Sequence, residues 1–122
     1  MIPDTFGQYG HYRGASLDEI KALDVKYLGE AACLDCHEEY GDMKGEDLHA
    51  EISCESCHGP GWKHVEEPAP ENIVVPSGRE FCALCHEENA ARSNRAVAQI
   101  SLNEHNPDNS CVECHNPHAP WQ

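Results

Sequence analysis

The segment Cys33-Leu34-Asp35-Cys36-His37 decides the fold, because its spacing recurs three more times along the chain. The other copies are Cys54-Glu55-Ser56-Cys57-His58, Cys82-Ala83-Leu84-Cys85-His86 and Cys111-Val112-Glu113-Cys114-His115. All eight cysteines of the 122-residue chain therefore fall into four C-x-x-C pairs, and a histidine directly follows each pair. C-x-x-C-H is the motif at which haem c is attached.

This spacing has a chemical reason. Two thiols three positions apart lie on one helical turn and can both add to the vinyl groups of one porphyrin, and the adjacent imidazole then becomes the proximal iron ligand. We therefore predict four haem c groups as cofactors. Their attachment sites are Cys33, Cys36, Cys54, Cys57, Cys82, Cys85, Cys111 and Cys114, and their proximal ligands are His37, His58, His86 and His115.

Other uses of paired cysteines fit the pattern less well. Four thiolates, or three thiolates and an imidazole, could hold zinc. Eight cysteines could also form disulfides in 105 ways. Thioredoxin-like chemistry uses C-x-x-C on a βαβ pattern, which this sequence lacks. None of these alternatives requires a histidine after every second cysteine.

Five further histidines are available as distal ligands: His11, His49, His64, His105 and His118. Four of them form an internal repeat in the order motif, His, motif, His. The first copy carries His49 and His64, and the second carries His105 and His118. This order predicts two dihaem modules in tandem. We expect His49 to serve the haem of His37 and His105 that of His86. The trailing His64 and His118 would then serve the second haems of the two units, directly or crosswise.

His11 stands outside the repeat, in the glycine-rich and aromatic stretch 6–14. It is either an ordinary surface histidine or a distal ligand to a haem of a neighbouring subunit, since a terminal arm with little structure can reach another chain.

Composition restricts the fold and the partners. Phe, Trp and Tyr make up 7% of the chain, so the conventional core is thin and we expect the haems to form most of it. The formal charge of −14 argues against nucleic acid or an anionic membrane as partner and favours basic redox proteins. No stretch approaches the roughly 20 apolar residues of a membrane span. The start, Met1-Ile2-Pro3-Asp4, has no signal-peptide pattern, so we expect a mature form of an exported, periplasmic or extracellular protein.

Two segments resemble a known family. The stretch from Tyr27-Leu28-Gly29-Glu30 through Cys57-His58-Gly59-Pro60-Gly61-Trp62-Lys63-His64-Val65 resembles the cytochrome c554-like multihaem family. His105-Asn106-Pro107 and Cys114-His115-Asn116-Pro117-His118 resemble an element common in multihaem cytochromes. The resemblance covers residues 27–118 and implies bis-His haems in stacked and perpendicular pairs. Tetrahaem subunits of extracellular cytochrome filaments carry similar motifs, and there the next subunit can donate a distal histidine.

The expected fold is mainly α with much irregular structure: one small multihaem cytochrome domain, 1–122, wrapped around four haems. Its parts are an N-terminal arm (1–26), dihaem unit A (27–67), a link (68–79) and dihaem unit B (80–122). We expect a capping box at Ser16–Glu19 to open a helix that ends near Leu23, and the longest helix to span 80–100. The proline-rich stretch 60–77 should be irregular, with 73–75 as the one strand candidate.

Coordination predicts the function. A haem with two protein ligands has no open position for a substrate, so the expected function is electron transfer and not catalysis. The chain could act as a soluble shuttle or as a subunit of a homopolymeric filament bridged through His11 or another distal histidine. The alternative is a redox enzyme with one five-coordinate haem.

Overall fold

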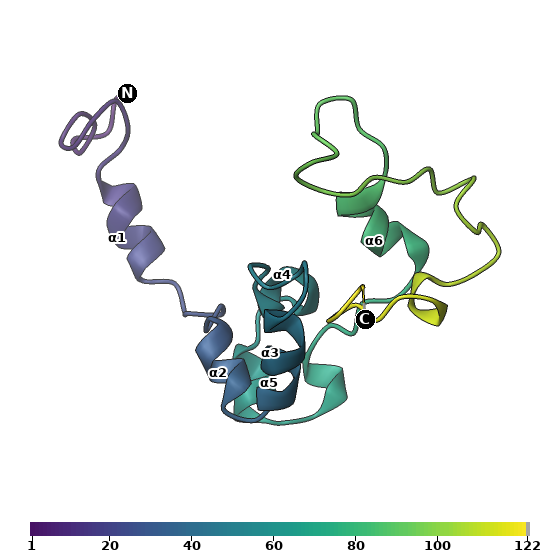
Figure 1. Cartoon of the computed structure of the whole chain (residues 1–122). Coiled ribbons are helices and arrows are strands. Elements are labelled where there is room, and N and C mark those ends of the chain that lie inside the picture. The colour runs from purple at the N-terminus through teal and green to yellow at the C-terminus, as the bar shows by residue number, and fades with distance from the viewer. Residues whose placement is uncertain (122) are drawn as a thin grey trace.

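A computed structural model describes residues 1–121 as short helices joined by irregular segments (Figure 1). The helices are α1 (Ala15–Lys21), α2 (Glu30–Leu34), α3 (Glu38–Gly45), α4 (Cys54–His58), α5 (Trp62–Glu66), η1 (Pro70–Asn72), α6 (Arg79–His86) and η2 (Cys111–Glu113), where η denotes a 3₁₀-helix. Within residues 1–121, β-pairing is limited to three isolated bridges. The expected combination of helix and irregular structure is confirmed.

The helices form a central group that has an extension on either side (Figure 1). Helices α2 and α3 pack on each other, α4 packs on α2, and α5 packs on η1. The arm with α1 stands off from this group on one side, and α6 with its long following loop lies on the other. The C-terminal segment returns to the group, where the Trp121 amide donates to Asp47 Oδ2 at 3.2 Å.

The apolar core of the polypeptide is almost absent. Among residues 1–121, Ala119 is the single hydrophobic residue that is fully buried, and two charged residues, Lys44 and Glu55, are buried with it. Many large apolar side chains remain exposed, including Leu84 and Val112 inside the third and fourth C-x-x-C-H motifs. The predicted thin core is confirmed, and packing of the chain on itself explains little of its shape.

Each C-x-x-C-H motif lies on a helical turn, as the spacing predicts. The second motif is α4 itself, and the third occupies the end of α6. In the first and fourth motifs the turn closes after the named helix, where the His37 amide donates to Cys33 O at 3.0 Å and the His115 amide to Cys111 O at 2.9 Å.

The long helix expected over 80–100 is wrong, because α6 ends at His86. Glu87 is already extended, with φ −66° and ψ 140°. The chain then makes a loop and returns, so that the Ile100 amide donates to His86 O at 2.8 Å and the Glu88 amide to Ile100 O at 3.1 Å. Alanine propensity contributes only tenths of a kcal/mol per residue, so tertiary hydrogen bonds outweigh it.

The capping box expected at Ser16–Glu19 is also wrong. Helix α1 has Gly14 as its N-cap without a side-chain cap, and the Glu19 carboxylate pairs instead with both terminal nitrogens of Arg13. Ser16 lies inside the helix, where its hydroxyl donates to Arg13 O at 2.6 Å. A capping box does form at η2, between Ser110 and Glu113.

The proline-rich stretch 60–77 is only partly irregular, because it contains α5 and η1. No proline interrupts 61–67, so a helical turn can form there and carries His64. Residues 73–75 form no strand. Val74 instead bonds to His58 through both its amide and its carbonyl, at 3.2 Å and 2.9 Å.

Candidate haem sites

Eight histidine rings are arranged in four pairs. The centroids are 6.2 Å apart for His37 and His64, 6.1 Å for His58 and His118, 6.1 Å for His49 and His86, and 6.3 Å for His105 and His115. The ring planes are inclined by 7° to 38°. Each pair combines one motif histidine with one spare histidine, and His11 belongs to none of the four pairs.

The partners differ from the expected ones. His49 lies opposite His86 and not His37, and His105 lies opposite His115 and not His86. His64, expected at a second haem, faces His37 of the first motif. His118 faces His58, which is the crossed form of its expected assignment.

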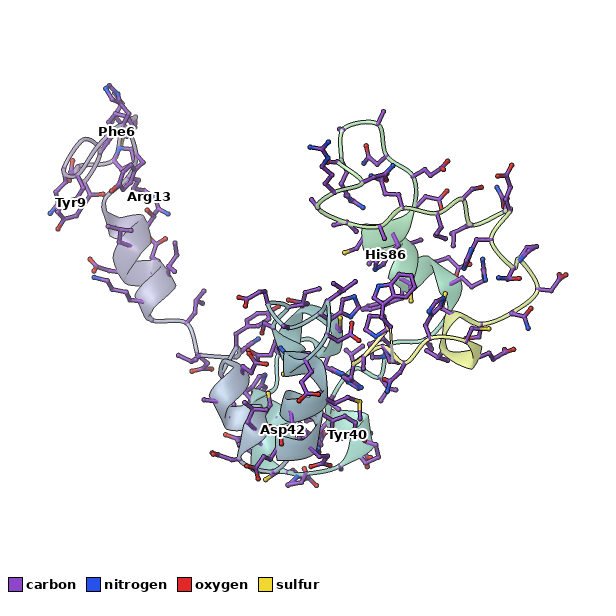
Figure 2. All side chains as sticks on the ribbon, in the orientation of Figure 1. Phe6, Tyr9, Arg13, Tyr40, Asp42 and His86 are labelled. Carbon is purple, nitrogen blue, oxygen red and sulfur yellow. The ribbon has the colours of Figure 1, made fainter. Side chains whose placement is uncertain are left out.

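Two of the four pairs join the two halves of the repeat. His49 precedes the second motif but faces His86 of the third, and His118 follows the fourth motif but faces His58 of the second. Figure 2 shows His86 on the side of α6 that faces the α2–α5 group. Two pairs therefore lie within one unit each, 27–67 or 80–122, and the other two join these units.

Backbone carbonyls orient five of the paired rings. The Nδ1 atoms of His49, His58, His64 and His86 lie 2.8 to 2.9 Å from the carbonyl oxygens of Pro117, Val74, Ala69 and Ala98. His115 Nδ1 lies 3.4 Å from Pro120 O. Since a carbonyl only accepts, Nδ1 carries the proton and Nε2 keeps its lone pair, which is the tautomer that binds a metal. Burial, followed by the nearby His58 and His49 rings and by Lys44, lowers the pKa of His118.

The cysteines are all free thiols and approach one another across motifs. Burial and then the neighbouring Cys54 raise the pKa of the Cys33 thiol to about 11. Burial, with Cys85 second, raises the pKa of Cys57, and burial, with Cys111 second, raises that of Cys82. The first motif therefore neighbours the second, the second neighbours the third, and the third neighbours the fourth. Within residues 1–121 no three Cys, His, Asp or Glu side chains converge as a ligand set for one metal ion.

Lys44 holds the segment that carries His49. Its Nζ, on the buried side of α3, donates to Ala50 O at 3.0 Å and Ile52 O at 2.8 Å, and pairs with Glu30 Oε1 at 2.5 Å. One ammonium group thus joins α3 to α2 and to the turn that follows His49. The ammonium uses all three of its donors in these contacts.

Glu55 has the corresponding role near His64. This buried residue of the second motif accepts from the Gly61 amide at 2.9 Å, the Leu28 amide at 3.0 Å and the Gly29 amide at 2.9 Å. Burial alone would raise the pKa of Glu55, but the three backbone donors outweigh it and the pKa is lowered. The carboxylate therefore joins the lead-in of the first motif to the start of α5.

The sequence reasoning missed Lys44 and Glu55 as parts of the site, as well as the carbonyl acceptors. Glu55 occupies a variable position inside its motif, and Lys44 sits on a helix rich in charged residues, where solvent exposure is the ordinary expectation. A backbone carbonyl carries no side-chain signal at all.

Comparison with known proteins gives distant relatives. The chain is 28% identical over 108 aligned residues to the C-type polyheme cytochrome OmcB of two strains of Geobacter sulfurreducens. The alignment covers 75% of this chain and 14% of the relative, so the chain spans a small part of the length of the relatives it matches. No protein-family model and no solved structure matches the chain. The similarity supports a multihaem c-type cytochrome in general, and not the narrower c554-like tetrahaem family.

Proposed function

We propose that the chain transfers electrons through four covalently bound, bis-His-ligated haem c groups. The observation that carries the proposal is the set of four imidazole pairs, each with one member from a C-x-x-C-H motif. Haem iron supplies the reversible one-electron chemistry when bound.

The spacing of the rings suits an iron between them. With a metal–imidazole bond of about 2 Å and roughly 1 Å from nitrogen to ring centre, two trans imidazoles have centres about 6 Å apart. The observed separations of 6.1 to 6.3 Å agree with this value. The cysteines of each motif lie on the same turn as its histidine and would supply the thioether links.

One motif histidine and one spare histidine would hold each iron. His64, His118, His49 and His105 would occupy the sixth position at the haems of His37, His58, His86 and His115 respectively. With two histidines at each iron, no position would remain vacant for a substrate, and the proposal is therefore electron transport without catalysis. Because neighbouring cysteines come from successive motifs, the haems would lie in the order of the sequence, from the first motif to the fourth.

Carbon monoxide added to the reduced protein tests this proposal. The unsubstituted protein should show no rapid optical change, because all four irons are six-coordinate, and electrospray mass should correspond to four haems per chain. A haem that binds carbon monoxide at once would support the alternative, a redox enzyme with a five-coordinate site. Nitrite would then be the second probe.

A filament is the second candidate, and the N-terminal arm favours it. Residues of the arm such as Ile2, Leu23 and Val25 are about 70% exposed. Figure 2 shows Phe6, Tyr9 and Arg13 at the far end of the arm, away from the helix group. Such a surface could contact a second copy of the chain, with His11 or another distal histidine bridging subunits. The same four haems would serve a shuttle or a polymer.

Sedimentation velocity separates these two forms. A filament subunit should form large species whose proportion rises with protein concentration, and removal of residues 1–26 should leave monomers with all four haems intact. A single monomer boundary at all concentrations would count against the filament and leave the shuttle.

We further propose that the protein is exported. Its C-x-x-C-H motifs and its similarity to C-type polyheme cytochromes both favour haem attachment outside the cytoplasm. In the described part of the chain, residues 1–121, none of the helices has the length and apolar character to cross a bilayer. The charge of −14 favours basic redox partner proteins over nucleic acid.

A further inference from the structure

The segment 101–109 carries His105 but has little structure of its own. It consists of turns, in which the His105 amide donates to Ser101 O at 2.9 Å and the Asn109 amide to Asn106 O at 3.1 Å. Asn106 takes a left-handed conformation with φ 45°. In the described chain, no backbone carbonyl orients the His105 ring as those of Pro117 or Val74 orient His49 and His58. Something else must hold this ring opposite His115.

Arg79, the first residue of α6, reaches into this segment with its guanidinium. Its Nη1 donates to Asn106 O at 2.8 Å and Asn109 O at 2.6 Å, and its Nη2 to Leu102 O at 2.9 Å and His105 O at 2.7 Å. The four carbonyls flank His105 on both sides and include its own. Among residues 1–121, no carboxylate forms an ion pair with Arg79.

The geometry needs an arginine. A planar guanidinium presents its N–H groups in a fixed fork and can serve four acceptors at once, whereas a lysine ammonium has three donors on a flexible stem. Ordering an irregular segment costs backbone entropy, and charge-assisted hydrogen bonds offset part of that cost. The same helix carries Cys82, Cys85 and His86. A haem attached there would hold α6 in place, and with it the Arg79 side chain.

We propose that Arg79 is a positioning residue: its guanidinium holds the segment 102–109 in the conformation that presents His105 to the iron of the haem attached at Cys111 and Cys114. The inference rests on the proposed bis-His function. It assigns to Arg79 one haem of the four, namely the one with His115 as proximal ligand.

The test compares Arg79→Gln, Arg79→Lys and His105→Ala in the full haem-loaded protein, with Arg13→Gln as the matched control. The Arg13 guanidinium pairs with Glu19 in the exposed arm and, in the described chain, donates to none of the segments that carry the eight paired histidines. Carbon monoxide bound per reduced chain is counted by optical titration. We expect none for the control, one for His105→Ala, and close to one for Arg79→Gln. Arg79→Lys should lie between zero and one, because the ammonium can serve only some of the carbonyls.

Two further readouts distinguish positioning from a general loss of stability. The double variant Arg79→Gln with His105→Ala should still bind one carbon monoxide, since both changes act on the same iron. Added imidazole should restore the low-spin spectrum of Arg79→Gln by replacing the displaced His105. Binding at two or more haems in Arg79→Gln, or additivity in the double variant, would overturn the assignment.

The outcomes separate the inference from the function on which it rests. If His105→Ala binds no carbon monoxide, bis-His ligation is wrong at this haem and the proposed function fails there. If His105→Ala opens one haem while Arg79→Gln keeps four six-coordinate haems, the function stands and the role of Arg79 is refuted. If Arg79→Gln does not accumulate with four haems, Arg79→Lys decides: unchanged six-coordinate spectra in that variant overturn the proposal.

Discussion

A chain produced without its haems should be unfolded under native conditions. The described polypeptide buries one hydrophobic residue, Ala119, so apolar burial offsets very little of the conformational entropy of folding. That entropy amounts to roughly 100–200 kcal/mol for a domain of about 100 residues. In the proposed haem-loaded form, the porphyrins would supply the missing apolar contacts, and their thioether bonds and histidine ligands would supply the missing cross-links. Folding and cofactor binding are then one process, as in small metal-organised domains.

Cytoplasmic expression without haem attachment provides the test, with mass spectrometry confirming the haem-free chain. Circular dichroism should lack helical bands, and amide proton shifts should show little dispersion. The haem-loaded protein in the same buffer is the control and should show a cooperative thermal transition. A haem-free chain with dispersed amide resonances and cooperative unfolding would contradict the expectation, because it would reveal a core that the polypeptide forms alone.

Removing His49 should open the haem of the third motif and leave the haem of the first motif closed. The two rings His49 and His86 face each other at 6.1 Å, although the chain order places His49 between the first and second motifs. The single variants His49→Ala and His86→Ala should each make one haem reactive toward carbon monoxide. Because both act on one iron, the double variant should still have one reactive haem. His49→Ala combined with His37→Ala should have two.

The converse pattern would restore the assignment within one unit. If His49→Ala with His37→Ala gave one reactive haem, and His49→Ala with His86→Ala gave two, His49 would serve the first motif. His11→Ala is the matched control, since His11 lies in none of the four pairs, and it should leave all haems unreactive. A different result would indicate ligation between subunits. In that case His11→Ala would open a haem, and dilution of the unsubstituted protein would open one as well.

Several features of the site could be predicted from sequence because their chemistry is local. A C-x-x-C-H segment needs only one helical turn to bring two thiols and an imidazole together, and all four segments do form such turns. The thin core could be predicted from composition. The chain has few aromatic residues, and its eight cysteines all belong to the C-x-x-C-H motifs, so few apolar side chains remain to be buried. The sequence singled out nine histidines, namely His11 and the eight that the structure arranges in pairs, but it did not predict the pairing.

Local propensity failed where tertiary hydrogen bonds compete with it. The alanine-rich stretch after His86 favours a helix by tenths of a kcal/mol per residue. This stretch is nevertheless not helical, because the chain folds back and places Ala98 O 2.8 Å from His86 Nδ1. The Ser16–Glu19 box failed for a similar reason, since Arg13 offers the Glu19 carboxylate two charged donors.

The sequence by itself predicted how many haems the chain could attach, at which cysteines, and which histidines could serve as iron ligands. Only the tertiary structure decided which distal histidine faces which motif. His118 reaches His58 across sixty residues of chain, and His49 reaches His86 across thirty-seven. The physical reason is that an irregular segment can place its histidine opposite a motif that is far away in the sequence. Its position depends on backbone carbonyls and on the charged groups of Lys44, Glu55 and Arg79, and those contacts exist only in the folded chain.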